Sequence, residues 1–136
     1  MPVSGCVARV DFLGTGNAFC PSGRMHALAI LDEKILIDAP PTLLAQMRRS
    51  NISTGQVEHI LFTHWHGDHA FGFPFLILDR KYITDTSADK ILALHHRPGG
   101  REYLTSLSKL GFPGSLEDFL ESRIFWNDEE LSLIHI

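Results

Sequence analysis

Hydrophobic residues recur with two different periods along the chain, and these periods predict an alternation of strands and helices. Alternating or short continuous apolar runs predict strands over residues 7–13, 27–31, 34–37, 57–63, 90–95 and 122–126. Apolar residues at helical spacing predict helices over residues 40–50, 68–83 and 99–110. A β-rich beginning followed by strand–helix alternation indicates a mixed α/β (α+β) fold.

Local signals mark several of the boundaries between these elements. Asp32 and Glu33 separate two strand-like runs and predict a hairpin. The helix over 40–50 has prolines in its first turn and arginines in its last, which suits the helix dipole. Gly72 and Pro74 interrupt the pattern over 68–83, so we expect an irregular helix there.

A cluster of metal-binding residue types follows the predicted strand 57–63. It reads His64-Trp65-His66-Gly67-Asp68-His69. In extended backbone His64 and His66 share a face, and Gly67 lets the chain turn so that Asp68 and His69 come round beside them. Neutral imidazoles and a carboxylate suit zinc, iron or manganese. The alternative is a polar, histidine-rich surface turn. The spacing favours a metal site.

The pattern His-x-His-x-Asp-His resembles the signature of the metallo-β-lactamase superfamily of metal-dependent hydrolases. Residues 12–16 (Phe-Leu-Gly-Thr-Gly) resemble the opening strand and glycine turn of that family, and residues 35–39 (Ile-Leu-Ile-Asp-Ala) resemble its second signature. The resemblance is stronger to the ribonuclease Z and cyclic phosphodiesterase branches than to the antibiotic-degrading branch. It implies the N-terminal half of an αββα sandwich, truncated before the second sheet.

The resemblance also implies a role for each residue of the cluster. His64 and His66 are expected to bind one metal ion, and Asp68 and His69 a second one. Both are expected to be divalent, with zinc favoured over manganese or iron. Asp68 is also the expected catalytic residue, because it can orient the nucleophile or pass a proton. Asp38 is expected to support the metal loop without binding metal, and an ordinary helix cap before residues 40–42 is its alternative role.

These roles predict a metal-dependent hydrolase in which a metal-activated hydroxide attacks a phosphodiester. The expected substrate is a nucleic acid or a small molecule resembling a cyclic nucleotide. An iron-dependent sulfur or oxygen redox enzyme and a non-catalytic metal-binding fragment remain alternatives. A nucleotide-binding module at residues 14–16 is a weaker hypothesis, because Phe19 replaces the third glycine of the dinucleotide fingerprint.

The later signatures of the superfamily, which supply further His and Asp ligands, have no clear counterpart in this chain. His95 and His96 are the internal candidates for a further ligand. Residues 131–136 resemble a non-native tail, so we expect a partial domain over residues 1–130 and leave His135 out of the site. With the second sheet missing, we expect a large uncovered apolar face.

Composition narrows the functional classes further. The 136 residues carry a net charge of −4, which gives no electrostatic case for general nucleic-acid binding. Cys6 and Cys20 are too few for a disulfide framework and are expected to be reduced thiols. No signal-peptide pattern and no run of about 18 apolar residues occurs, which predicts a cytoplasmic protein without membrane contact.

Overall fold

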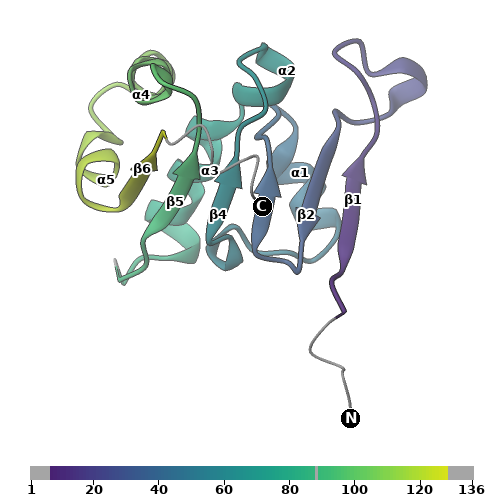
Figure 1. Ribbon diagram of the computed structural model, residues 1–136, viewed down its shortest axis with the longest axis horizontal. Helices are drawn as coiled ribbons and strands as arrows, with labels where there is room; N and C mark the ends of the chain where they lie inside the picture. The colour runs from purple at the N-terminus through teal and green to yellow at the C-terminus, as the bar shows by residue number, and fades with distance from the viewer. Residues whose placement is uncertain (1–6, 88, 129–136) are drawn as a thin grey trace.

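The computed structural model describes residues 7–87 and 89–128, and these form one mixed sheet with helices packed against it (Figure 1). The six strands lie side by side in chain order. The first three strands pair antiparallel, and β3 to β6 pair parallel. The strands are β1 Val10–Gly14, β2 Leu28–Leu31, β3 Ile35–Ile37, β4 His59–Leu61, β5 Leu92–His95 and β6 Ile124–Asn127. All six predicted strands and the predicted hairpin are therefore confirmed, with ends that differ by a few residues.

The helices connect the parallel strands, the predicted interruption at Gly72 is confirmed, and α5 (Glu117–Ser122) is the one described α-helix that was not predicted. They are α1 Leu43–Arg49, α2 Gly67–Ala70, α3 Phe73–Asp79, α4 Gly100–Gly111 and α5 Glu117–Ser122, with short 3-10 turns at Pro21–Gly23 and Thr54–Gln56 and a π-helical turn at Arg80–Thr84. The prediction did not include α5, because a helix of six residues is too short to show a helical period.

The helix predicted over 68–83 is divided at Gly72 into α2 and α3. Gly72 N–H donates to Ala39 O at 2.8 Å, and a Cβ on Gly72 would lie 1.9 Å from Pro40 O. The segment after β3 therefore touches the α2–α3 junction backbone to backbone. Only glycine permits this approach.

One face of the sheet forms the core. Side chains alternate between the two faces of each strand, and those on the helical side are buried. The buried sheet residues are Leu28, Ile30, Leu36, Ile60, Leu92, Leu94 and Ile124. They pack in one cluster with residues from α1, α3, α4 and α5, including Leu43, Met47, Phe73, Leu76, Leu104 and Phe119. Figure 1 shows α1 and α3 behind the sheet.

The opposite face carries an apolar surface that the described residues leave uncovered, as expected. The strand registers align two rows across it, Phe12–Ala29–Ile37–Leu61–His95–Asn127 and Val10–Leu31–Ile35–His59–Ala93–Phe125. Every member of both rows is half-buried or exposed. Phe12 is 74% exposed and Phe125 is 57% exposed. Exposed large apolar side chains on one face of a sheet are typical of a surface that packs against further protein structure.

A polar chain of three side chains interrupts this face. The Nδ1 of His59 lies 3.0 Å from the Nε2 of His95, and the amide of Asn127 donates to the Nδ1 of His95 at 2.8 Å. Burial lowers the pKa of His95, and the neighbouring His59 and His96 lower it further. His95 is therefore held in its neutral form inside a hydrogen-bonded chain.

The lowered pKa of His95 predicts a pH-dependent stability. The unfolded chain takes up a proton on this side chain near its ordinary pKa of about 6.5, whereas the folded chain does so only at lower pH. The His95 contribution to stability should therefore be complete above pH ~6.5 and decrease as pH falls from there toward the lowered folded pKa. Urea unfolding between pH 7.5 and 5 should show a shallower pH dependence for His95→Gln than for wild type. His26→Gln serves as the control, and an identical slope for wild type and His95→Gln would contradict the interpretation.

Within the described ranges, no helix is long and apolar enough to cross a membrane. The predicted cytoplasmic location stays a prediction. Cys20 is a free thiol. Cys6, His135 and the tail predicted over 131–136 lie outside the described residues, so the division of the chain at residue 130 also stays a prediction.

Candidate metal centre

The histidine cluster lies at the carboxyl edge of the parallel strands, where β4 runs into α2. His66 is the last residue before α2 and has extended backbone, with φ −61° and ψ 148°. The ring of His64 lies 4.7 Å from that of His66 and 4.1 Å from that of His69, between centroids. The short α2 therefore brings His69 back toward the two histidines that precede it.

Asp38 lies at the centre of the hydrogen bonding around this cluster. It follows β3 with a left-handed φ of 67°, and its side chain is buried. Its Oδ1 accepts from Thr63 N at 2.7 Å, while its Oδ2 accepts from Thr63 Oγ1 at 2.6 Å and faces His69 Nδ1 at 2.8 Å. Both carboxylate oxygens are thus occupied by donors of the loop that carries the histidines.

These contacts determine which ring nitrogens carry protons. A carboxylate only accepts, so His69 must donate through Nδ1–H. Thr63 gives its hydroxyl proton to Asp38 and must therefore accept from the Nδ1–H of His64, which lies 3.0 Å away. In the neutral rings the Nε2 atoms of His64 and His69 are then left with free lone pairs, the form that binds metal.

Asp68 lies against the free nitrogen of His69. Its Oδ2 is 3.2 Å from His69 Nε2. With the proton of His69 on Nδ1, these two atoms both present lone pairs to each other. A cation between them, either a proton or a metal ion, removes the repulsion. Two ligand atoms about 2.0–2.2 Å from one metal ion have nearly this separation when the angle between them is close to tetrahedral.

The structure brings the predicted site residues together. Asp38, His64 and His69 each offer one ligand atom, and these atoms lie within 4.8 Å of one another. His66 lies against His64, and Asp68 against His69. Which of these atoms bind metal stays a prediction.

His95 and His96 have partners elsewhere. His95 belongs to the chain with His59 and Asn127. His96 is buried, its Nδ1 lies 2.8 Å from Arg97 O, and its ring packs edge-on against Trp126. Thr63, in contrast, was not among the predicted site residues. Its position directly before His64 was visible in the sequence, but its hydrogen bonds to Asp38 depend on how β3 and β4 pair.

The glycine turn of residues 14–16 borders the centre as a tightly packed turn. A Cβ on Gly14 would lie 2.2 Å from Gln46 Nε2 and from His26 O, and Gly16 N–H donates to Met25 O at 2.7 Å. With Thr15, Asp38 and His69, Gly14 lines a cavity of about 290 Å³. Packing therefore explains these glycines, and the amide of Gly16 is already in use.

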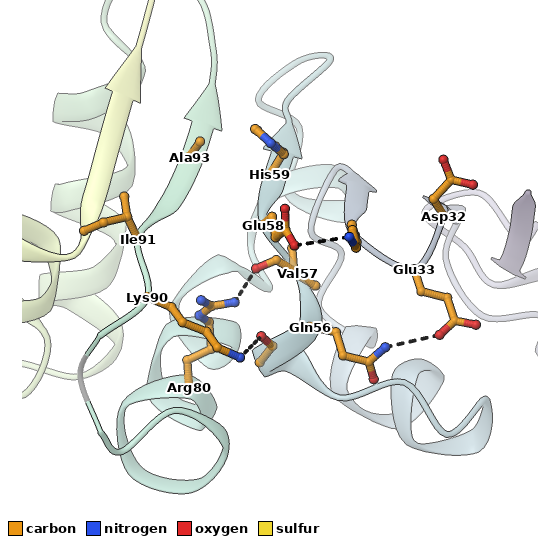
Figure 2. Close-up of a pocket in the computed structure, with 12 residues that line it drawn as sticks. Asp32, Glu33, Gln56, Val57, Glu58, His59, Arg80, Lys90, Ile91 and Ala93 are labelled. Atoms are coloured by element: carbon orange, nitrogen blue, oxygen red, sulfur yellow. Dashed lines mark hydrogen bonds and ion pairs between the residues drawn. The ribbon is translucent and has the colours of Figure 1, made fainter. Parts of the chain in front are cut away.

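A larger cavity of about 640 Å³ lies at the opposite edge, where β3, β4 and β5 begin (Figure 2). Several of its charged side chains already have partners. Lys34 pairs with Glu58 at 3.7 Å, Lys90 donates to Gly55 O at 3.3 Å, and Arg80 donates to Val57 O at 2.6 Å. The gathered imidazoles are at the other edge, so we place the candidate site there.

The family model of the anti-Pycsar protein Apyc1 matches residues 8–99, which include the whole histidine cluster. The chain belongs to this family. It is also similar to ribonuclease Z from Haloferax volcanii, with 34% identity over 106 residues that make up 76% of this chain and 32% of the relative. Ribonuclease Z from Listeria welshimeri is 34% identical over 130 residues, 90% of this chain and 40% of the relative. The chain thus spans about a third to two fifths of the length of these relatives.

Solved structures show the same fold. Human tRNase Z, short form, superimposes with a TM-score of 0.67 at 23% identity, covering 88% of this chain and 44% of that one. Zinc-bound PqqB from Methylobacterium extorquens gives a TM-score of 0.58 at 12% identity, covering 89% of this chain and 48% of that one. The predicted resemblance of the chain to the N-terminal part of the metallo-β-lactamase superfamily, in a ribonuclease Z-like branch, is confirmed by the ribonuclease Z relatives. The solved structures confirm the predicted fold, which corresponds to about half of these longer chains.

The hydrogen bonds of Asp38 predict a specific effect of Asp38→Asn. The amide nitrogen of asparagine donates rather than accepts. In place of Oδ1 it leaves the Thr63 N–H without an acceptor, and in place of Oδ2 it leaves both the Thr63 hydroxyl and the Nδ1–H of His69 without one. Either orientation disrupts the hydrogen bonding that supports the loop, and the second releases the proton of His69 from Nδ1. Loss of such a supporting carboxylate typically weakens metal binding about 10–100-fold. We expect a decrease of that size in zinc affinity, measured by competition with a chromophoric chelator.

Asp32→Asn is the matched control, because Asp32 also has positive φ, at 52°, but lies in the exposed β2–β3 turn. Equal zinc affinities for Asp38→Asn and Asp32→Asn would contradict the role given to Asp38.

Proposed function

We propose that the chain provides the metal-binding half of a phosphodiester-hydrolysing metalloenzyme. The observation that carries this proposal is the pairing of His69 Nε2 with the Asp68 carboxylate at 3.2 Å, while Asp38 holds the proton of His69 on Nδ1. A cation between two lone-pair-bearing groups at this distance, a metal ion or a proton, would stabilise their approach. The donor set around them, imidazoles and carboxylates, suits a divalent transition metal.

The residues of the histidine cluster and Asp38 have the following roles in this proposal. His64 and His66 would hold one divalent ion, and Asp68 and His69 a second one, with zinc preferred and manganese or iron possible. Asp38 would support the site through His69 rather than bind metal, because three donors already occupy most of the acceptor positions on its carboxylate. The bound ions would supply hydroxide at neutral pH and neutralise charge on the phosphate. Asp68 would also orient the nucleophile or pass a proton.

The substrate class follows from the relatives. The chain resembles proteins named ribonuclease Z and tRNase Z, and these names support a nucleic-acid phosphodiester as the substrate. A small molecule resembling a cyclic nucleotide stays the alternative substrate. The cavity lined by Gly14, Thr15 and His69 places open space next to the proposed ligands. An iron-dependent redox enzyme remains the second candidate, because the same donors also bind iron.

Metal content tests the ligand assignments directly. His66→Ala removes one of two proposed ligands of the first ion, so metal bound per chain should decrease relative to wild type after dialysis against zinc. His59→Ala is the control, because His59 lies on β4 at the uncovered face. Elemental analysis should find zinc rather than iron in wild type. Unchanged zinc in His66→Ala would refute its assignment, and stoichiometric iron would favour the redox enzyme.

We expect the chain alone to hydrolyse bis(p-nitrophenyl) phosphate barely above background. The first ion would have two protein ligands, His64 and His66, where a catalytic zinc usually has three. The site also lies on one sheet with its opposite face uncovered, so water would weaken the electrostatic stabilisation of a transition state. Robust metal-dependent turnover would contradict this expectation. In that event His95→Ala and His96→Ala would test whether either supplies a ligand.

A further inference from the structure

Trp65 stands between two proposed metal ligands but is held by a different part of the molecule. The rings of His64 and His66 lie together, 4.7 Å apart. The ring of Trp65 instead packs on that of Tyr103, at 4.8 Å between centroids and 32° between planes, and on Phe62 at 5.3 Å. The side chain between the two histidines is therefore anchored on α4 and the core.

The same tyrosine also holds the backbone of the metal loop. The hydroxyl of Tyr103 donates to Trp65 O at 2.8 Å. The hydroxyl of a tyrosine is protonated at neutral pH, and burial raises the pKa of Tyr103 further, so it can donate this bond. Trp65 O belongs to the peptide that joins Trp65 to His66. A hydrogen bond to this oxygen restrains the orientation of the Trp65–His66 peptide plane. That orientation in turn affects the direction in which the His66 side chain points.

The first turn of α4 also contacts the indole of Trp65, through Gly100. A Cβ on Gly100 would lie 2.8 Å from Trp65 Cζ2 and 2.5 Å from His96 Nδ1. Gly100 therefore lets α4 approach the indole closely, and the buried His96 lies beside it. Tyr103 and Gly100 of α4, together with Phe62 directly after β4, surround Trp65.

We propose that Tyr103 is a positioning residue for the metal centre, holding Trp65 by ring contact and by its carbonyl so that His64 and His66 keep the orientation that binds metal. The proposal rests on the proposed function of this loop. Metal sites need their ligands held within about 0.5 Å and 10–20° of the binding geometry. Neither histidine is buried, so packing of their own rings does not supply this restraint. The anchored tryptophan between them does.

Tyr103→Phe isolates the hydroxyl, because the ring that stacks on Trp65 is retained. Tyr82→Phe is the matched control, since Tyr82 is 52% exposed and lies in the π-helical turn Arg80–Thr84. We expect cobalt affinity to decrease about 10-fold in Tyr103→Phe, with altered visible absorption of the bound cobalt, and to stay unchanged in Tyr82→Phe. Chemical denaturation of both metal-free variants measures any loss of stability separately.

Imidazole ¹⁵N and ¹H NMR shifts of the metal-free protein provide a second test that requires no metal. Shifts of the His66 and His64 rings should change in Tyr103→Phe and not in Tyr82→Phe. Gly100→Ala should produce a similar change by displacing the indole, without removing any hydrogen-bonding group. Unchanged ring shifts and an unchanged cobalt spectrum in Tyr103→Phe would overturn the inference, even if the variant were less stable. If the wild type binds no cobalt, the proposed function is overturned. If Tyr103→Phe still changes the imidazole shifts of His64 and His66 relative to that wild type, the positioning by Tyr103 stands.

Discussion

The buried carboxylate of Asp38 joins the parts of this structure that make the candidate site. A carboxylate removed from water is costly unless donors surround it, and Asp38 meets this need with the backbone and hydroxyl of Thr63 and the imidazole of His69. These donors lie before and after the other histidines. One side chain at the end of β3 therefore fixes both ends of the loop between β4 and α2.

The backbone around Asp38 strengthens the same connection. Asp38 N–H donates to Leu61 O, Ala39 N–H donates to His69 O, and Gly72 N–H donates to Ala39 O, each at 2.8 Å. The segment after β3 is thus bonded to the end of β4, to α2 and to the α2–α3 junction. The parallel register of β3 and β4 brings these segments to one edge of the sheet. The loop is further restrained from the α4 side, where Tyr103 holds Trp65.

Local patterns predicted the parts of this arrangement that depend on neighbouring residues in the chain. Alternating apolar residues predicted the strands, and the spacing of His64, His66, Asp68 and His69 predicted the cluster. The interruption at Gly72 was predicted, but the close passage of the chain after β3 against Gly72 was not. Apart from the short α5, the missed features depend on contacts between distant segments. Thr63 matters because β3 ends beside it, and His95 became part of a chain with His59 because β4 and β5 are neighbours.

Asp38 holds the proton of His69 on Nδ1, which leaves Nε2 and the Asp68 carboxylate free to bind a cation between them. A crystal structure of the chain grown with zinc, with data collected on both sides of the zinc absorption edge, would locate that cation. We expect an anomalous peak about 2.0–2.2 Å from both His69 Nε2 and an Asp68 oxygen, with Asp38 still bonded to His69 Nδ1. A peak coordinated by Asp38, or zinc bound away from His69, would refute this arrangement.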